Sequence, residues 1–281
     1  MIEDFKHFLE VRGLADNTIR AYVVALKQFK QFIRKPLDKA ELEDIDDWIW
    51  RMKGNGKKHT TINLKLNAIK RYYKFCDRRG EISDNARKLK EIELLTIKQV
   101  EREIVDEETV RMMLDQLDDD RDKAILAIMF NCGLRISEIV SLNKKNFEEK
   151  EDYVRVRIVH SKRNKSRTVF MNYFYYNFVK EYMESHTNRR GKVFISKIDG
   201  TGLAHDTINR RVKAFSRELL GKELTTHDYR ASCFTHMYRQ GVDIFTIAKW
   251  AGHSSIETTK SYIEADELDI VSKTRGAFYE Q

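Results

Sequence analysis

The chain has 281 residues, of which 41% are apolar, and its 52 Lys and Arg against 44 Asp and Glu give a net charge of +8. The apolar share excludes wholesale disorder, the length suggests two domains, and the positive charge favours an anionic partner such as nucleic acid. Three isolated cysteines without a C-x-x-C pair argue against a disulfide framework or a zinc knuckle. No stretch reads as a bilayer span or a signal peptide, so we expect a cytoplasmic protein without a membrane partner.

Residues 1–95 are predicted to form a small helical bundle. Apolar residues at helical spacing indicate four helices, at about 2–12, 17–33, 42–54 and 60–80. Charge is segregated, because residues 51–90 hold 13 Lys or Arg against three Asp or Glu. This clustering favours contact with the DNA backbone, and a solvated helix face is the alternative. The candidate contacts are Lys57, Lys58, Lys65 and Arg71.

A linker at residues 96–104 is expected to join the bundle to a second domain, residues 105–281. Helical patterns open this domain and run to Cys132, where Gly133 ends a helix. Alternation by two over residues 153–159 and 168–171, around a polar turn, predicts a β-hairpin. Residues 193–195 are a candidate for one more short strand, and the remaining pattern is helical. The sequence therefore predicts a mainly α fold with a small antiparallel β-sheet.

The chain break at Gly133 places Arg135 in the first turn of a helix. Exposed backbone amides and a guanidinium together suit a phosphate at such a position. Glu138 lies three residues on, on the same face, and is placed to hold Arg135. The alternative is a surface Arg–Glu pair at a helix start.

Two further basic segments are candidates for DNA contact. The hairpin turn carries Lys162, Arg163 and Lys165, and a lysine at its tip is a compact proton donor for a leaving oxygen. A later helix that includes residues 209–217 carries Arg210 and Arg211. The alternatives are an ordinary basic turn and a solvated helix face.

The last candidates are two histidines, an arginine and a tyrosine. His227 and Arg230 are spaced i, i+3 in the first turn of a helix, so they point the same way and suit a pentacoordinate phosphate. The alternative assigns His227 to helix capping and Arg230 to solvent. His253 follows a helix-ending glycine, and Tyr262 comes nine residues later. A tyrosine is more often a core residue, and as a nucleophile it needs cations or a base nearby.

The order of these residues in a basic two-domain chain resembles the tyrosine recombinase family of phage integrase type. The resemblance covers nearly the whole chain. Its sharpest parts are C-G-L-R-I-S-E at 132–138, H-D-Y-R-A-S at 227–232 and G-H-S-S-I-E-T-T-K-S-Y at 252–262. In size the chain is most similar to the Xer branch, in particular to a compact archaeal or bacterial member.

The resemblance implies a site-specific recombinase that breaks and rejoins DNA through a 3′-phosphotyrosine intermediate, without metal, ATP or another cofactor. It assigns the catalytic roles to Arg135, Lys162, His227, Arg230, His253 and the nucleophile Tyr262, with Glu138 in support. It also implies a helical DNA-binding domain and a catalytic domain that close on double-stranded DNA as a clamp. The expected partners are paired inverted half-sites and, through a C-terminal exchange tail, three further copies in a tetramer on DNA.

Three positions depart from the family pattern. Ala231 stands where many members have a second histidine, Ser161 replaces a glycine before the hairpin lysine, and Thr225 and Thr226 stand in place of a proline. None of these changes removes a proton donor or a phosphate ligand, so activity is still expected.

Several functions stay open at this point. Resolution of chromosome or plasmid dimers is favoured, because no extra arm-binding domain is evident, and an integrase or excisionase of a mobile element is the alternative. A type IB topoisomerase-like enzyme and a DNA-binding protein without chemistry are the rivals from other classes.

Overall fold

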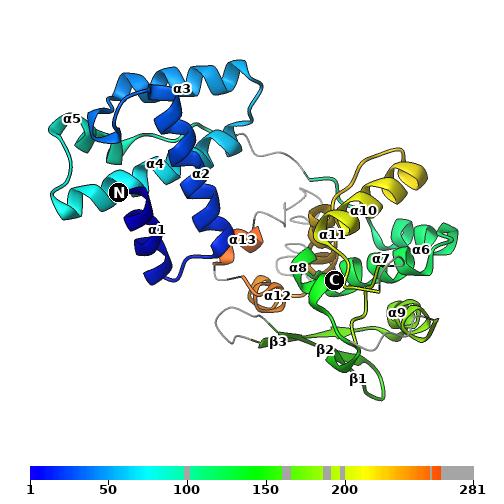
Figure 1. The fold of residues 1–281 in the computed structure, drawn as a ribbon. Coiled ribbons are helices and arrows are strands. Elements are labelled where there is room, and N and C mark those ends of the chain that lie inside the picture. Colours follow the sequence, from blue (N-terminus) through cyan, green and yellow to red (C-terminus); the bar gives the residue numbers. More distant parts are fainter. Residues whose placement is uncertain (98–101, 160–165, 186–190, 197–199, 254, 261–281) are drawn as a thin grey trace, which may run out of the picture. The chain divides into compact units, whose positions relative to one another are not determined.

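A computed structural model describes residues 1–97, 102–159, 166–185, 191–196, 200–253 and 255–260. The chain divides into two compact units, Met1–Val100 and Glu101–Gln281 (Figure 1). Both are mainly helical, and the second contains a small antiparallel sheet. This is the fold class that the sequence predicts. In the described part of the chain, no helix has both the length and the apolar character needed to cross a membrane.

The first unit is built on its fourth helix. Its elements are α1 (Ile2–Val11), α2 (Asp16–Ile33), η1 (Leu37–Lys39), α3 (Leu42–Gly54), α4 (His59–Arg79), α5 (Asp84–Arg87) and η2 (Lys88–Glu91). Helix α4 packs against α2, α3, α5 and η2. Its inward residues, which include Ile62, Leu66, Ile69 and Tyr73, recur at helical spacing and are buried. Apart from Leu64, the exposed side chains of α4 are polar or basic.

The second unit is built around α7. Its helices are α6 (Glu107–Gln116), α7 (Asp120–Cys132), α8 (Ile136–Ser141), η3 (Lys144–Asn146), α9 (Tyr173–Ser185), α10 (His205–Leu220), α11 (Thr226–Arg239), α12 (Ile244–Ala251) and α13 (Ile256–Lys260). Helix α7 packs against α6, α9, α10 and α11 and is buried on nearly every side. A helix in that position is apolar all round, which is why its sequence shows little amphipathic pattern.

The sheet consists of β1 (Phe147–Glu149), β2 (Val154–Val159) and β3 (Ser166–Met171), in that order. Strands β2 and β3 form the predicted hairpin. At one end of the ladder Val154 pairs with Met171, and at the other end Val159 pairs with Ser166. Alternate residues of both strands are buried, as period-two patterning requires.

Two details of the sheet differ from the sequence expectation. Strand β1 is not predicted, because three residues are too short to show a period. Residues 193–195 do not form a strand, and among the described residues Ile195 makes only an isolated bridge with Gly202. One bridge pairs too few backbone groups to build a ladder.

A close approach at Gly133 positions two of the candidate site residues, Arg135 and Arg230. Gly133 ends α7 with a φ of +60°, and a β-carbon there would lie 2.7 Å from Cε1 of Phe234 and 3.0 Å from Sγ of Cys233. Only glycine leaves room for α11 at this distance. The turn thereby brings Arg135, which follows Gly133, next to Arg230 of α11, whose guanidinium donates to the Gly133 carbonyl.

Replacing Gly133 by alanine should destabilise the protein more than the same change at Gly221. Both glycines end a helix with positive φ, +60° and +67°, so both variants carry the cost of alanine in the left-handed region. Only at Gly133 does the added methyl group meet neighbours, and overpacking of this kind costs about 1–3 kcal/mol. Urea denaturation measures the free energy of unfolding of both variants, and equal losses would contradict the close approach of α11.

Candidate DNA interface and active site

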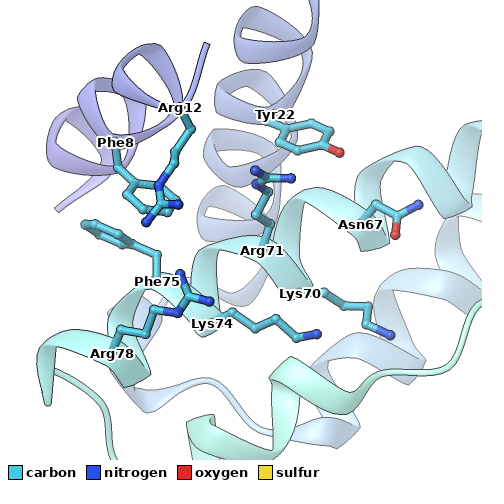
Figure 2. Close-up of a pocket in the computed structure, with 9 residues that line it drawn as sticks. All are labelled: Phe8, Arg12, Tyr22, Asn67, Lys70, Arg71, Lys74, Phe75 and Arg78. Carbon is cyan, nitrogen blue, oxygen red and sulfur yellow. The ribbon is translucent and has the colours of Figure 1, made fainter. Parts of the chain in front are cut away.

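The exposed side of α4 carries a basic pocket of about 420 Å³, which we call the α4 pocket (Figure 2). Nine residues line it: Phe8, Arg12, Tyr22, Asn67, Lys70, Arg71, Lys74, Phe75 and Arg78. Five of them are Arg or Lys and none is acidic, so the pocket suits a chain of phosphates. Arg71, which the sequence singles out, is part of it.

The other basic residues predicted to contact DNA in the first unit lie around the start of α4. Lys57 and Lys65 line a second pocket, and Lys58 is the exposed residue before α4. Lys65 is partly buried, donates to Oε1 of Gln28 at 2.7 Å and lies over the ring of Trp48. It is therefore less available for a ligand than its two neighbours.

The two arginines singled out in α10 differ in their surroundings. Arg210 is exposed. The guanidinium of Arg211 pairs with the carboxylate of Asp122, which is buried on α7. Arg211 therefore joins α10 to α7 in addition to any contact it makes outside the protein.

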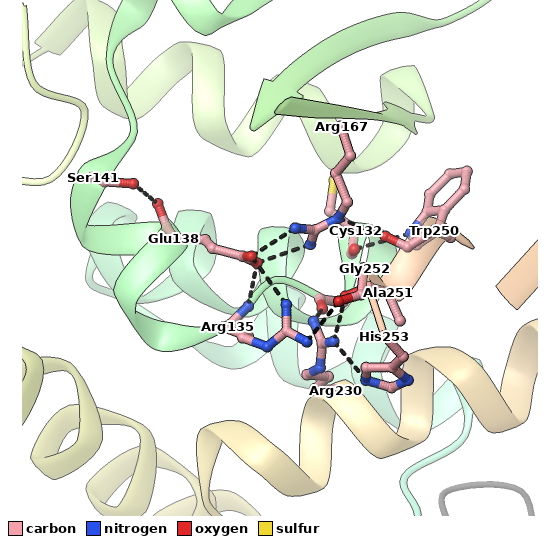
Figure 3. A network of polar contacts seen from close by, with 11 residues as sticks. Cys132, Arg135, Glu138, Ser141, Arg167, Arg230, Trp250, Ala251, Gly252 and His253 are labelled. Carbon is pink, nitrogen blue, oxygen red and sulfur yellow. Dashed lines mark hydrogen bonds and ion pairs between the residues drawn. The ribbon is translucent and has the colours of Figure 1, made fainter. Parts of the chain in front are cut away.

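Three arginines converge on the carboxyl end of α12. Three successive carbonyls accept hydrogen bonds there: Trp250 O from Arg167 Nε at 2.7 Å, Ala251 O from Arg230 Nη2 at 2.8 Å and Gly252 O from Arg135 Nη2 at 3.1 Å. Figure 3 shows these side chains meeting from β3, α11 and the start of α8. The last carbonyls of a helix lack intrahelical partners and carry partial negative charge, so they orient cations. We call Arg135, Arg167, Arg230, Glu138 and His253 the arginine cluster.

Arg230 is the buried centre of the arginine cluster, with 1% of its surface exposed. It is the fifth residue of α11, a helix that Thr225 caps through a reciprocal contact with Asp228. Its guanidinium donates to the carbonyls of Gly133 and Ala251, which end α7 and α12. Arg230 thus lies where three helix ends meet, rather than in solvent.

Arg135 is held at the start of α8 by Glu138. The carboxylate of Glu138 accepts from the Arg135 amide at 2.8 Å and from its Nη1 at 3.2 Å. Glu138 is 3% exposed, whereas Arg135 is 33% exposed, so the pair is not a surface ion pair. The arrangement leaves one side of the Arg135 guanidinium open to a ligand.

Arg167 is a member of the arginine cluster that sequence reasoning missed. It donates to Glu138 through Nη1 at 2.6 Å and Nη2 at 2.8 Å. Burial favours a higher pKa for Glu138, but hydrogen bonds and charge from Arg167, with smaller effects of Arg135, lower this pKa to about 2. In the period-two pattern of β3, Arg167 shares the buried face with Val169 and Met171, and that signal would have found it.

His253 follows α12 and is oriented from both sides of its ring. Nε2 lies 3.0 Å from Nη2 of Arg230, and Nδ1 lies 2.8 Å from Oγ1 of Thr259, a fully buried residue of α13. Because arginine only donates, Nε2 accepts, which assigns the proton of the neutral ring to Nδ1. The sequence does not single out Thr259, because nothing local shows that its hydroxyl reaches His253.

His227 lies beside the arginine cluster in the first turn of α11. Burial, and next the charges of Arg102 and Arg230, lower its pKa, so it is neutral at pH 7. Thr225, not His227, is the residue that caps α11. A neutral imidazole that solvent reaches at this place is suited to accept a proton.

Four predicted site residues lie outside the described residues. They are Lys162, Arg163, Lys165 and Tyr262. In the chain, the first three fall between β2 and β3, and Tyr262 comes two residues after the end of α13. The C-terminal exchange tail also falls outside. In the described ranges, no group of three or more His, Cys, Asp or Glu residues is arranged to hold a metal ion.

Comparison with known proteins gives two family matches. The phage integrase family matches residues 95–268, and the N-terminal SAM-like domain of phage integrases matches residues 2–80. Tyrosine recombinase XerA of Pyrococcus furiosus is 27% identical over 93% of this chain and 88% of its own length. Tyrosine recombinase XerD of Oceanobacillus iheyensis is also 27% identical, over 93% of this chain and 92% of its own.

Solved structures share the fold. The XerH site-specific recombinase bound to palindromic difH substrate has a TM-score of 0.73 at 18% identity, over 92% of this chain and 79% of that one. The integrase of transposon Tn1549, in complex with transposon right end DNA, has a TM-score of 0.73 at 18% identity and covers 98% of both chains.

The ring of His253 should stay neutral in the folded protein down to about pH 5. Burial, then Arg230, Arg135 and Arg167, lower its pKa to about 4, against a smaller opposing effect of Glu138. Since the folded pKa lies below the unfolded value of about 6.5, the stability from this group is complete above pH 6.5. It is lost as the pH falls from 6.5 towards 4.

Melting temperatures between pH 7 and 4 measure this effect. The wild-type protein should lose stability more steeply than His253→Gln, which has no imidazole to keep neutral. His227 also resists protonation, and it is present in both proteins, so the difference between them isolates His253. Parallel curves would show that His253 titrates normally.

Proposed function

The chain belongs to the phage integrase family and is a tyrosine recombinase, an enzyme that cleaves and rejoins DNA at specific sites, and from this premise we propose that the arginine cluster binds the phosphate at which the strand is cut. The supporting observation is the convergence of Arg135, Arg230 and His253 on the end of α12. The two guanidinium groups donate from the starts of α8 and α11 towards one place, beside the ring of His253, as stabilisation of a pentacoordinate phosphate requires.

In the proposed reaction, the phenolic oxygen of Tyr262 attacks the phosphorus atom. The bond from phosphorus to the 5′-oxygen breaks, a 3′-phosphotyrosine forms, and Lys162 protonates the departing 5′-oxygen, which leaves as a 5′-hydroxyl. The neutral ring of His227 takes the phenolic proton or positions Tyr262. A 5′-hydroxyl from another duplex then reverses the step, which exchanges strands without an external energy source.

Charge stabilisation is the part of this mechanism that the described residues supply. Arg135 and Arg230 donate to the non-bridging oxygens, and the loss of one such donor typically lowers the rate by about 10²–10³-fold. A phosphate beside His253 would raise the pKa of its ring and let it donate as well. Glu138 keeps Arg135 oriented while this charge develops.

We extend the proposal to a Xer-type role, the resolution of chromosome or plasmid dimers, because relatives named XerA and XerD align over most of this chain. A tetramer on DNA with paired inverted half-sites would carry it out, with residues 267–281 docked on a neighbouring copy. A transposon integrase shares the fold, so integration of a mobile element is the second candidate. Recombination between two sites on one plasmid would favour dimer resolution, and insertion into a second DNA molecule would favour integration. Relaxation of supercoils without recombination would favour a topoisomerase.

Tyr262→Phe should bind DNA normally and form no covalent complex, since only the nucleophilic oxygen is removed. The substrate is a nicked duplex of the site that the protein itself selects from random DNA. The adduct is detected by denaturing electrophoresis, with Tyr279→Phe as the matched control that retains activity. An adduct with Tyr262→Phe, or its loss with Tyr279→Phe, would move the nucleophile to another tyrosine.

Lys162→Ala should be rescued by a better leaving group. A 5′-bridging sulfur needs little protonation, so a substrate that contains it does not require a general acid. We expect slow cleavage of the ordinary substrate and near-normal cleavage of the sulfur substrate, measured as single-turnover rates. Equal slowness on both substrates would make Lys162 a groove contact.

Removal of basic residues from the α4 pocket should weaken DNA binding for all sequences alike. Arg71→Ala and Lys74→Ala should each reduce the slope of log affinity against log salt by about one. Lys27→Ala is the control, because Lys27 lies in a groove that Glu3, Glu10 and Asp16 also line. Salt titration of binding measures the slopes, and unchanged slopes for the pocket variants would exclude a phosphate contact there.

A further inference from the structure

We propose that Arg167 is a positioning residue for strand cleavage, which couples the β2–β3 hairpin to the residues that bind the phosphate. The inference rests on the proposed function of the arginine cluster. Each of its three guanidinium nitrogens donates to Glu138 or to the Trp250 carbonyl, and the Glu138 carboxylate balances its charge, so it acts through its neighbours rather than on DNA.

The first link runs through the Glu138 carboxylate. Arg167 holds both oxygens of this group with a two-pronged contact at 2.6 and 2.8 Å, whereas the guanidinium of Arg135 reaches it at 3.2 Å. A planar fork on a carboxylate restricts the orientation of both groups. Arg167 therefore sets the orientation of Glu138, and Glu138 sets that of Arg135.

The second link runs through the end of α12. Nε of Arg167 donates to the Trp250 carbonyl at 2.7 Å. The same side chain packs on Gly252, where a β-carbon would lie 3.2 Å from its Cδ and Nη1. Gly252 is followed by His253, and its own carbonyl accepts from Arg135. Arg167 thus contacts the turn that presents His253 as well as the carboxylate that holds Arg135.

The third link is the place of Arg167 in the sheet. It is the second residue of β3 and pairs with Ile158 of β2. In the sequence, Lys162 falls between these two strands. A shift of β3 along or away from β2 would carry the Arg167 fork with it and displace Glu138 and the α12 turn together. A lysine at this position would keep the charge but lose the planar fork that holds both oxygens of Glu138.

The competing explanation is that Arg167 is only a buried ion pair that stabilises the unit. The two explanations differ in what a conservative change does. Loss of stability alone lowers melting temperature, DNA affinity and cleavage together. Loss of positioning lowers the cleavage rate of folded, DNA-bound protein, because a misplacement of about 1 Å in reacting groups costs about 10²-fold in rate.

The test uses the full chain and the nicked duplex described above. For wild type, Arg167→Lys and Arg111→Lys, it records DNA affinity, melting temperature and the single-turnover cleavage rate. Arg111 is the matched control, since its guanidinium binds Glu107 in an Arg–Glu pair of the same unit, on α6. We expect Arg167→Lys to cleave about 10²-fold more slowly with unchanged affinity, and Arg111→Lys to cleave at the wild-type rate.

A second measurement reports on the hairpin. If Arg167 positions the hairpin, the cleavage rate of Arg167→Lys should be partly restored on the 5′-bridging sulfur substrate. The part of the rate that is not restored measures the displacement of Arg135 and His253. If Arg167→Lys does not fold, the double variant Glu138→Gln, Arg167→Gln removes both buried charges, and it should bind DNA and cleave slowly.

The outcomes separate the two proposals. Wild type that forms no covalent adduct would overturn the proposed function. If the wild-type protein forms the adduct and Arg167→Lys cleaves at the wild-type rate, the positioning role alone is overturned. A loss that falls equally on rate, affinity and melting temperature, or that appears equally in Arg111→Lys, would also overturn it.

Discussion

The hydrogen bonds between three arginines and three successive carbonyls at the end of α12 organise the second unit. Each arginine comes from a different element, so the contacts bring β3, the start of α8 and the start of α11 to one place. Trp250 strengthens this junction by donating from its indole to the carbonyl of Cys132 at the end of α7, at 3.0 Å. Helix ends that would otherwise leave carbonyls without partners instead hold cations in fixed directions.

The same junction explains the electrostatics of the arginine cluster. Two guanidinium groups pair with one buried carboxylate and a third, that of Arg230, lies close by, so positive charge is in excess, and neutral His253 does not add to it. An excess of this kind is unfavourable without an anion, which makes a phosphate the natural complement. The charges that lower the pKa of His253 are therefore the ones that favour the ligand.

Sequence patterns predict the parts of this arrangement that depend on local spacing. The helical and period-two patterns predict the fold class, and the i, i+3 spacings bring Arg135 to Glu138 and His227 to Arg230. Contacts between distant segments lie beyond such reasoning, because Arg167 meets Glu138 across 29 residues and Arg230 meets Gly133 across 97. The α4 pocket likewise combines residues that the local sequence predicts with residues that only the fold brings together. The basic run predicts Arg71, whereas Arg12, the residue after α1, joins the pocket through packing alone.

The acceptors at the end of α12 are main-chain carbonyls, which every amino acid possesses. Substitution of the outward side chains of α12, such as the exposed Phe245, therefore leaves the hydrogen bonds to the arginines intact. The outward face of the helix can therefore change in sequence and in surface properties while the arginines beside it keep their hydrogen bonds. Backbone acceptors of this kind make the placement of the arginine cluster robust to mutation of the helix that holds it.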